Sequence, residues 1–161
     1  MRRSPQRYHF LTRWPVEASP AAAYAALYEV VEYPRWWPEV KEARKIDEDH
    51  LRLRTRALLP YDLAFTLIRQ LADPRRGILE ARLEGDLAGT IRWSIVPTDG
   101  GSLITFDERV ITQKELLDRL APIARPAFIA NHALMMRHGH AGLRAFLAGY
   151  ELGRAQAASG T

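Results

Sequence analysis

Residues 40–112, the middle of the chain, alternate apolar with polar side chains, and this period constrains the fold more than any other feature. In residues 51–57 (LRLRTRA), every second side chain is an arginine. A period of two is typical of a strand that buries one face. Turn sequences divide the region at 73–77 (DPRRG), 84–86 (EGD) and 97–101 (PTDGG). The region is therefore predicted to form about six consecutive antiparallel strands.

A strand and a helix are expected before this region. Residues 8–16 (YHFLTRWPV) are rich in aromatic and β-branched types, as strands are. Ser19 and Pro20 then supply an N-cap and a proline for the first turn of a helix. Apolar residues recur at helical spacing as far as Val31, which predicts a helix that Pro34 closes.

Helical periodicity returns after residue 113. Prolines interrupt residues 114–126, which predict a short helix or an irregular connector, and a long helix is expected from Pro126 to Leu147 or Gly149. A sheet of this size must cover its apolar face, and only one long helix is available to do so. We therefore predict an α+β fold in which a curved antiparallel sheet of about seven strands wraps around the C-terminal helix. One helix fills such a concavity incompletely, so an internal cavity is expected.

The stretch 33–40 reads YPRWWPEV and places two tryptophans between two prolines. Proline prevents a long regular element, so a turn or a single helical turn is predicted here, a second short helical element after the first strand. We expect it at the rim where the long helix meets the sheet, with its rings closing one end of the cavity. Adjacent side chains in a turn point in different directions. One tryptophan is therefore expected to be buried and the other partly exposed.

The composition is that of an ordinary soluble protein, with 47% hydrophobic and 26% charged residues. No apolar stretch is long enough to cross a bilayer, which predicts no stable membrane insertion. The absence of cysteine excludes disulfides and thiolate chemistry and fits a reducing, cytoplasmic location. The net charge of +4 is spread among apolar residues, so no nucleic-acid partner is expected. Residues 1–150 are predicted to be one domain, and residues 151–161 a disordered tail.

Three stretches in this order carry a family resemblance: YPRWWPEV after the first helix, EGDLAGTIRWSIVPTDGGSLITF, and NHALMMRHGHAGL in the last helix. Over residues 8–147 the chain resembles the START/SRPBCC superfamily, the helix-grip fold also found in birch-pollen-type allergens. It is most similar to the bacterial polyketide cyclase/dehydrase and lipid-transport branch. The resemblance implies a hydrophobic cavity between the sheet and the C-terminal helix, with a lipid, a polyketide or another apolar small molecule as partner. The chain departs from the cyclases because no catalytic signature matches residue by residue.

Side chains on the inward positions of the strands, in the aromatic turn and on the inner side of the long helix are predicted to line this cavity. They are Trp36, Phe65, Leu67, Arg69, Ile91, Trp93, Phe106, Glu108, Ile129, His132, Met135 and Met136.

Two charged residues in this set are candidates for chemistry. Arg69 is placed to bind a carboxylate or enolate oxygen, and Glu108 to act as an acid or a base. The alternatives are a bulge or register shift that turns either residue outward, or a structural ion pair between them. The phase of residues 102–112 is ambiguous, and in the other phase Asp107 and Arg109 would face inward.

His132 is a candidate proton shuttle, because imidazole titrates near neutral pH, or else a hydrogen-bonded residue at the edge of the core. His138 and His140 lie nearly opposite each other on a helix, so they cannot bind one metal ion together. No phosphate loop, nucleophile elbow, zinc-binding HExxH or dinucleotide fingerprint occurs. Neither a metal nor a cofactor is therefore expected.

Three functions remain. The favoured one is non-catalytic binding or transport of a hydrophobic small molecule in the cavity. The alternative is a polyketide cyclase/aromatase or dehydratase that acts on a ligand in the same cavity, with Arg69, Glu108 and His132 as its polar groups. The third is an interaction module that binds a protein or a membrane surface through its basic face or aromatic turn. Convergence of two ionisable groups in one pocket would favour an enzyme, and a filled interior would favour the interaction module.

Overall fold

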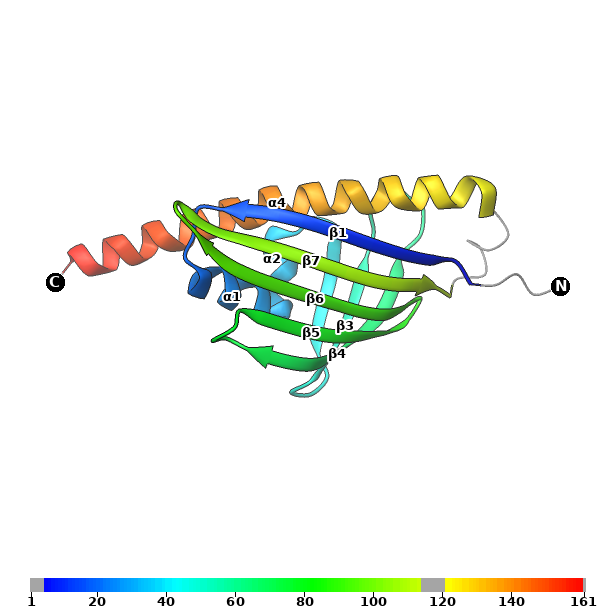
Figure 1. Ribbon diagram of the computed structural model, residues 1–161, viewed down its shortest axis with the longest axis horizontal. Helices are drawn as coiled ribbons and strands as arrows, with labels where there is room; N and C mark the ends of the chain where they lie inside the picture. The colour runs from blue at the N-terminus through cyan, green and yellow to red at the C-terminus, as the bar shows by residue number, and fades with distance from the viewer. Residues whose placement is uncertain (1–4, 114–120, 161) are drawn as a thin grey trace.

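A computed structural model of the protein describes residues 5–113 and 121–160 (Figure 1). The strands are β1 (Arg7–Val16), β2 (Val40–Lys45), β3 (His50–Thr55), β4 (Leu63–Asp73), β5 (Ile78–Gly85), β6 (Leu87–Thr98) and β7 (Gly101–Thr112). The helices are α1 (Pro20–Tyr28), the short 3-10 helix η1 (Val30–Glu32), α2 (Tyr33–Trp36) and α4 (Ala121–Ser159).

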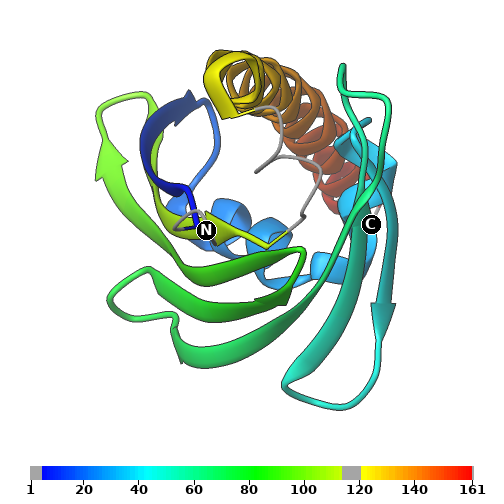
Figure 2. The same cartoon turned by 90° about the vertical axis from the view of Figure 1, so that its right-hand side faces the viewer.

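The strands form one 7-stranded sheet in the order β1-β7-β6-β5-β4-β3-β2, with antiparallel neighbours throughout. The sheet curls around α4, so that its two edge strands, β1 and β2, lie on either side of this helix (Figure 2). The short helices after β1 close one end of the concave side (Figure 1). The predicted helix-grip fold is confirmed.

The phase of β7, which the sequence left open, is decided by its two neighbours. Ile104, Phe106, Glu108 and Val110 are buried on the concave side, while the residues between them face outward. Pairing fixes this phase, because β7 hydrogen-bonds to β1 on one side and to β6 on the other, and both bury the matching face. The loop predicted at 97–101 is shorter than expected, since both strands extend into it.

The first helix differs from its prediction. It ends at Tyr28, and the chain passes through η1 before α2 begins at Tyr33. Pro34 therefore opens a new helical turn instead of closing the earlier helix, since a proline near a helix start costs no hydrogen bond. The single turn predicted for the YPRWWPEV stretch is confirmed as α2.

The C-terminal helix is longer than predicted at both ends. It begins at Ala121, so Pro126 lies inside it, and it continues to Ser159. Residues 151–159 are thus helical and exposed where a disordered tail was predicted. This end contains three alanines together with Arg154 and Gln156, all of them strong helix formers. Most of the connector predicted at 114–126 lies outside the described residues.

Both tryptophans of the aromatic turn are buried, so the prediction that one is partly exposed is wrong. Their rings stack at 5.5 Å, and the Trp37 indole N–H donates to the carbonyl oxygen of Met135 at 2.8 Å. Gly139 and Gly142 of α4 let the helix approach this closely, because a Cβ at either position would overlap Trp37 or Trp36. The helix therefore covers both indoles, and the exposed side of the turn is formed by Pro34, Arg35 and Pro38.

Candidate ligand-binding site

A cavity of about 90 Å³ lies between the sheet and α4. Most of the side chains predicted to line it do so: Phe65, Leu67, Ile91, Trp93, Phe106, Glu108, His132, Met135 and Met136. Further side chains that were not predicted from the sequence also line the cavity: Trp37, Val40, Leu53, Thr55, Leu63, Leu83, Leu87, Phe128 and Asn131. The leucines among them could have been predicted, because they lie at inward positions of the alternating strands.

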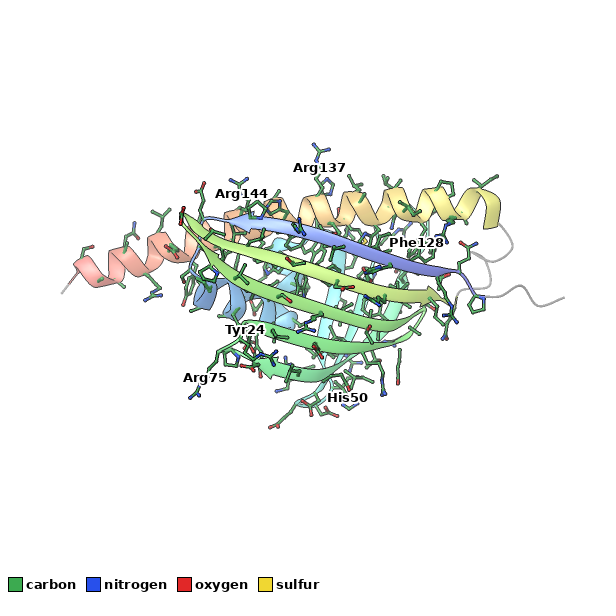
Figure 3. The ribbon with its side chains drawn as sticks, in the orientation of Figure 1. Tyr24, His50, Arg75, Phe128, Arg137 and Arg144 are labelled. Atoms are coloured by element: carbon green, nitrogen blue, oxygen red, sulfur yellow. The ribbon has the colours of Figure 1, made fainter. Side chains whose placement is uncertain are left out.

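Two predicted lining residues are replaced by their neighbours. Trp37 lines the cavity in place of Trp36, whose ring packs against Tyr33. Phe128 faces the cavity, and Ile129 is 42% exposed on the outer side of the helix (Figure 3 shows Phe128 pointing toward the sheet). Adjacent positions on a helix differ by about 100°, so a one-residue error in phase moves a side chain from the wall to the surface.

Arg69 lies outside the cavity, in a shallow groove of about 560 Å³ at the rim of the sheet. A bulge shifts the register of β4 just after Arg69, as the alternative interpretation of the sequence allowed. The guanidinium stacks 4.0 Å from the ring centroid of Tyr28 and donates to the hydroxyl and carbonyl oxygens of that residue, at 3.0 and 3.2 Å. A third bond joins it to the carbonyl oxygen of Glu48 at 3.3 Å. Arg69 thus holds β4, α1 and the β2–β3 turn together.

Glu108 and His132 form the polar centre of the cavity. The imidazole Nε2–H donates to Glu108 Oε2 at 2.6 Å, and the side chains of Glu108 and His132 are only 9% and 13% exposed. The imidazole also stacks on Phe10, with ring centroids 3.7 Å apart. The partner of Glu108 is therefore His132 and not Arg69. A carboxylate and an imidazole in contact can bind a polar group of a ligand or exchange a proton with it.

Asn131 ties α4 to the loop between β3 and β4. Its side-chain oxygen accepts the backbone N–H groups of Leu58 and Leu59, at 2.8 and 3.1 Å. The side chain is buried and also lines the cavity, so this bond holds the loop over one part of the cavity wall.

We expect Asn131→Leu to lower the free energy of unfolding by about 1–3 kcal/mol, because two loop N–H groups lose their acceptor. Amide hydrogen exchange at Leu58 and Leu59 should become faster. Ala133→Leu, an exposed position on the same helix, is the matched control and should leave both properties unchanged. Unaltered exchange in Asn131→Leu would contradict this role.

The other two helix histidines have separate partners. His138 Nδ1–H donates to the buried carboxylate of Glu39, and His140 donates to the carbonyl oxygen of Pro15 at 2.7 Å. Glu39 belongs to the YPRWWPEV stretch and was not singled out from the sequence. Within the described residues, no three potential metal-ligating side chains gather in one place.

The curved sheet, the long helix and the mostly apolar cavity between them define a helix-grip protein. The family described as polyketide cyclase / dehydrase and lipid transport matches residues 16–121, and the chain belongs to this family. A search of curated protein sequences finds no match. Nor does any described helix have the length and apolar character needed to cross a membrane.

Solved structures share this fold. The ZhuI aromatase/cyclase of Streptomyces sp. R1128 is 15% identical, with a TM-score of 0.74 over 89% of this chain and 94% of that protein. A START superfamily protein of Mycobacterium smegmatis is 19% identical, with a TM-score of 0.66 over 89% of this chain and 98% of that protein. At such identities the likeness concerns the fold alone.

Proposed function

We propose that the protein binds and transports a hydrophobic small molecule, lipid-like or polyketide-like, in the cavity between the sheet and α4. The observation that carries this proposal is the chemistry of the cavity wall. Aliphatic and aromatic side chains make up most of it, and its ionisable groups are the hydrogen-bonded pair Glu108 and His132. Apolar walls with a few convergent polar groups are typical of small-molecule sites.

The volume of about 90 Å³ limits how such a ligand is held. Ligand pockets usually measure about 300–1,000 Å³, so a lipid or a polyketide must displace side chains to enter. Met135 and Met136 are suited to this, because methionine is unbranched and adapts its shape at low cost. The proposal therefore includes expansion of the cavity on binding.

A further hollow lies between the cavity and the groove at Arg69. A neck of about 30 Å³ shares Leu67, Ile91 and Trp93 with the cavity, and shares Tyr28 and Arg69 with the groove. In our proposal, an amphipathic ligand keeps its acidic end at Arg69 while its apolar part reaches through the neck. This role deepens the carboxylate-binding role that the sequence suggested for Arg69.

Accordingly, Arg69→Ala should weaken binding of acidic ligands about tenfold or more, since a hydrogen bond to a charged group contributes about 1.5–3 kcal/mol. Binding of decanoic acid and of its methyl ester is compared by calorimetry. The two ligands share the alkyl chain, and only the acid carries a charge. Arg52→Ala, on the outward side of β3, provides the control. An equal loss for acid and ester would argue against the anchoring role.

The function as a whole is tested by native mass spectrometry, with lipid extraction, of protein purified from its own host. A co-purified apolar molecule that is absent from a cavity-filling Leu83→Trp variant would support it. Repeated failure to find or load any apolar molecule would refute it.

The second candidate function, a cyclase/aromatase or dehydratase, is favoured by one observation, the contact between Glu108 and His132. In a dehydration, the carboxylate would take a proton from the carbon next to a carbonyl. The imidazolium would give a proton to the departing hydroxyl, so that a C=C bond forms and water leaves. Turnover of a poly-keto thioester by the wild type, abolished in Glu108→Gln without loss of ligand binding, would support catalysis. Binding without turnover would leave only the carrier function.

A further inference from the structure

The outer side of β1 and α4, here called the β1–α4 face, carries a positive charge that ligand binding in the cavity does not require. Residues 7–16 and 121–150 contain no aspartate or glutamate. Their arginines are all exposed: Arg7, Arg13, Arg125, Arg137 and Arg144. Figure 3 shows Arg137 and Arg144 projecting from α4 away from the sheet.

This charge is not neutralised within the described part of the protein. Elsewhere, several arginines on the outer side of the sheet are paired with carboxylates, as Arg82 is with Glu84 and Arg92 with Glu80. By contrast, none of the described carboxylates lies within ion-pair distance of Arg13, Arg137 or Arg144. A cationic surface without internal counter-charges attracts an anionic partner.

Aliphatic side chains stand among these arginines. Ile123 is 74% exposed, Leu11 58% and Ile129 42%. A groove of about 580 Å³ between β1 and α4 includes Leu11 and Ile129 and has Arg13 and Arg137 in its walls. Exposed aliphatic groups beside arginines fit the boundary between lipid headgroups and acyl chains. Single-stranded nucleic acid would instead be expected to stack on exposed aromatic rings.

We propose that the β1–α4 face docks on the surface of an anionic bilayer. The arginines contact the phosphate groups, Ile123 and Ile129 enter the acyl boundary, and α4 lies along the surface. His132 and Met136 line both the outer groove and the internal cavity, so docking brings a wall of the cavity against the lipid. The proposal goes beyond ligand binding, because docking requires no ligand in the cavity.

The experiment is sedimentation with vesicles of phosphatidylcholine, alone or mixed with phosphatidylglycerol. We expect binding to the mixed vesicles only, and weaker binding as salt is added. Each arginine near an anionic surface contributes about fivefold, so the variant R13Q/R137Q/R144Q should bind about a hundredfold less. The control R44Q/R75Q/R76Q removes the same charge at other exposed sites and should bind like the wild type. In Figure 3, Arg75 lies on the side of the molecule opposite Arg137.

A second pair of measurements separates a bilayer from other polyanions. I123S/I129S should bind mixed vesicles about tenfold less, because less apolar surface enters the boundary, yet should bind heparin unchanged. Equal losses in the two arginine variants would overturn the proposal, as would tight binding to heparin or an acidic protein without binding to vesicles. All the substituted side chains are exposed, and thermal unfolding confirms that each variant folds. The single variants Arg137→Gln and Arg144→Gln, each expected to bind about fivefold less, replace the triple variant if it is unstable.

Discussion

Gly142→Ala is expected to lower the free energy of unfolding by about 3 kcal/mol, an unusually large effect for adding one methyl group. A Cβ at Gly142 would lie 1.7 Å from the carbonyl oxygen of Trp36 and 2.8 Å from the carbonyl carbon. Both are backbone atoms and cannot rotate away. The added methyl group must therefore push α4 away from α2 and from the stacked indoles of Trp36 and Trp37.

Urea unfolding measures this effect, and the same helix offers a matched control. A Cβ at Gly149 would have no other atom within 4 Å, so Gly149→Ala should stabilise the helix by about 0.5–1 kcal/mol. The two alanine variants are thus expected to change stability in opposite directions. If Gly142→Ala were as stable as Gly149→Ala, the close packing of α4 on α2 would be refuted.

The second large effect concerns the pair in the cavity. Glu108→Leu and His132→Leu should each cost about 3 kcal/mol, because each leaves a nearly buried polar partner without its hydrogen bond. The double variant should cost far less than the sum, since two apolar side chains replace the pair in an apolar cavity. Urea unfolding of the four proteins gives the coupling energy. Additive losses would show that the two side chains do not depend on each other.

The same variants distinguish a functional pair from a structural one. If the double variant folds stably, the polar pair is not needed for the fold, and a role toward the ligand accounts for its presence. Binding of a ligand with a carbonyl or hydroxyl group should then weaken in the double variant, while a pure hydrocarbon binds unchanged. If the double variant bound both ligands as tightly as the wild type does, the pair would have no role in ligand binding.

Much of the fold could be predicted because it depends on local periodicity. Alternation in residues 51–112 marked the strands and their inward positions, and the YPRWWPEV stretch marked a helical turn. Errors arose where a shift of one residue in the helical pattern changes which side chain faces the cavity. Phe128, and not Ile129, faces the cavity because contacts with the whole sheet set the rotation of α4 about its own axis. Those contacts involve residues distant in sequence.

The polar residues show the same division. Arg69, Glu108 and His132 were each singled out because a charged or titratable group at an inward position needs a partner. Which partner each would find could not be predicted. The bulge in β4 places Arg69 beside Tyr28, and the seating of α4 brings His132 to Glu108.

The sequence by itself determined the order of the elements, the curved sheet around one helix, and an interior lined mostly by apolar side chains. These properties follow from patterns that repeat within a few residues. Only the tertiary structure decided the burial of both tryptophans, the separation of Arg69 from the cavity, and the pairing of Glu108 with His132. The bulge in β4 decides the position of Arg69. The other two depend on how closely α4 approaches the sheet and the tryptophans, a distance set by packing between segments distant in sequence and by the glycines of α4.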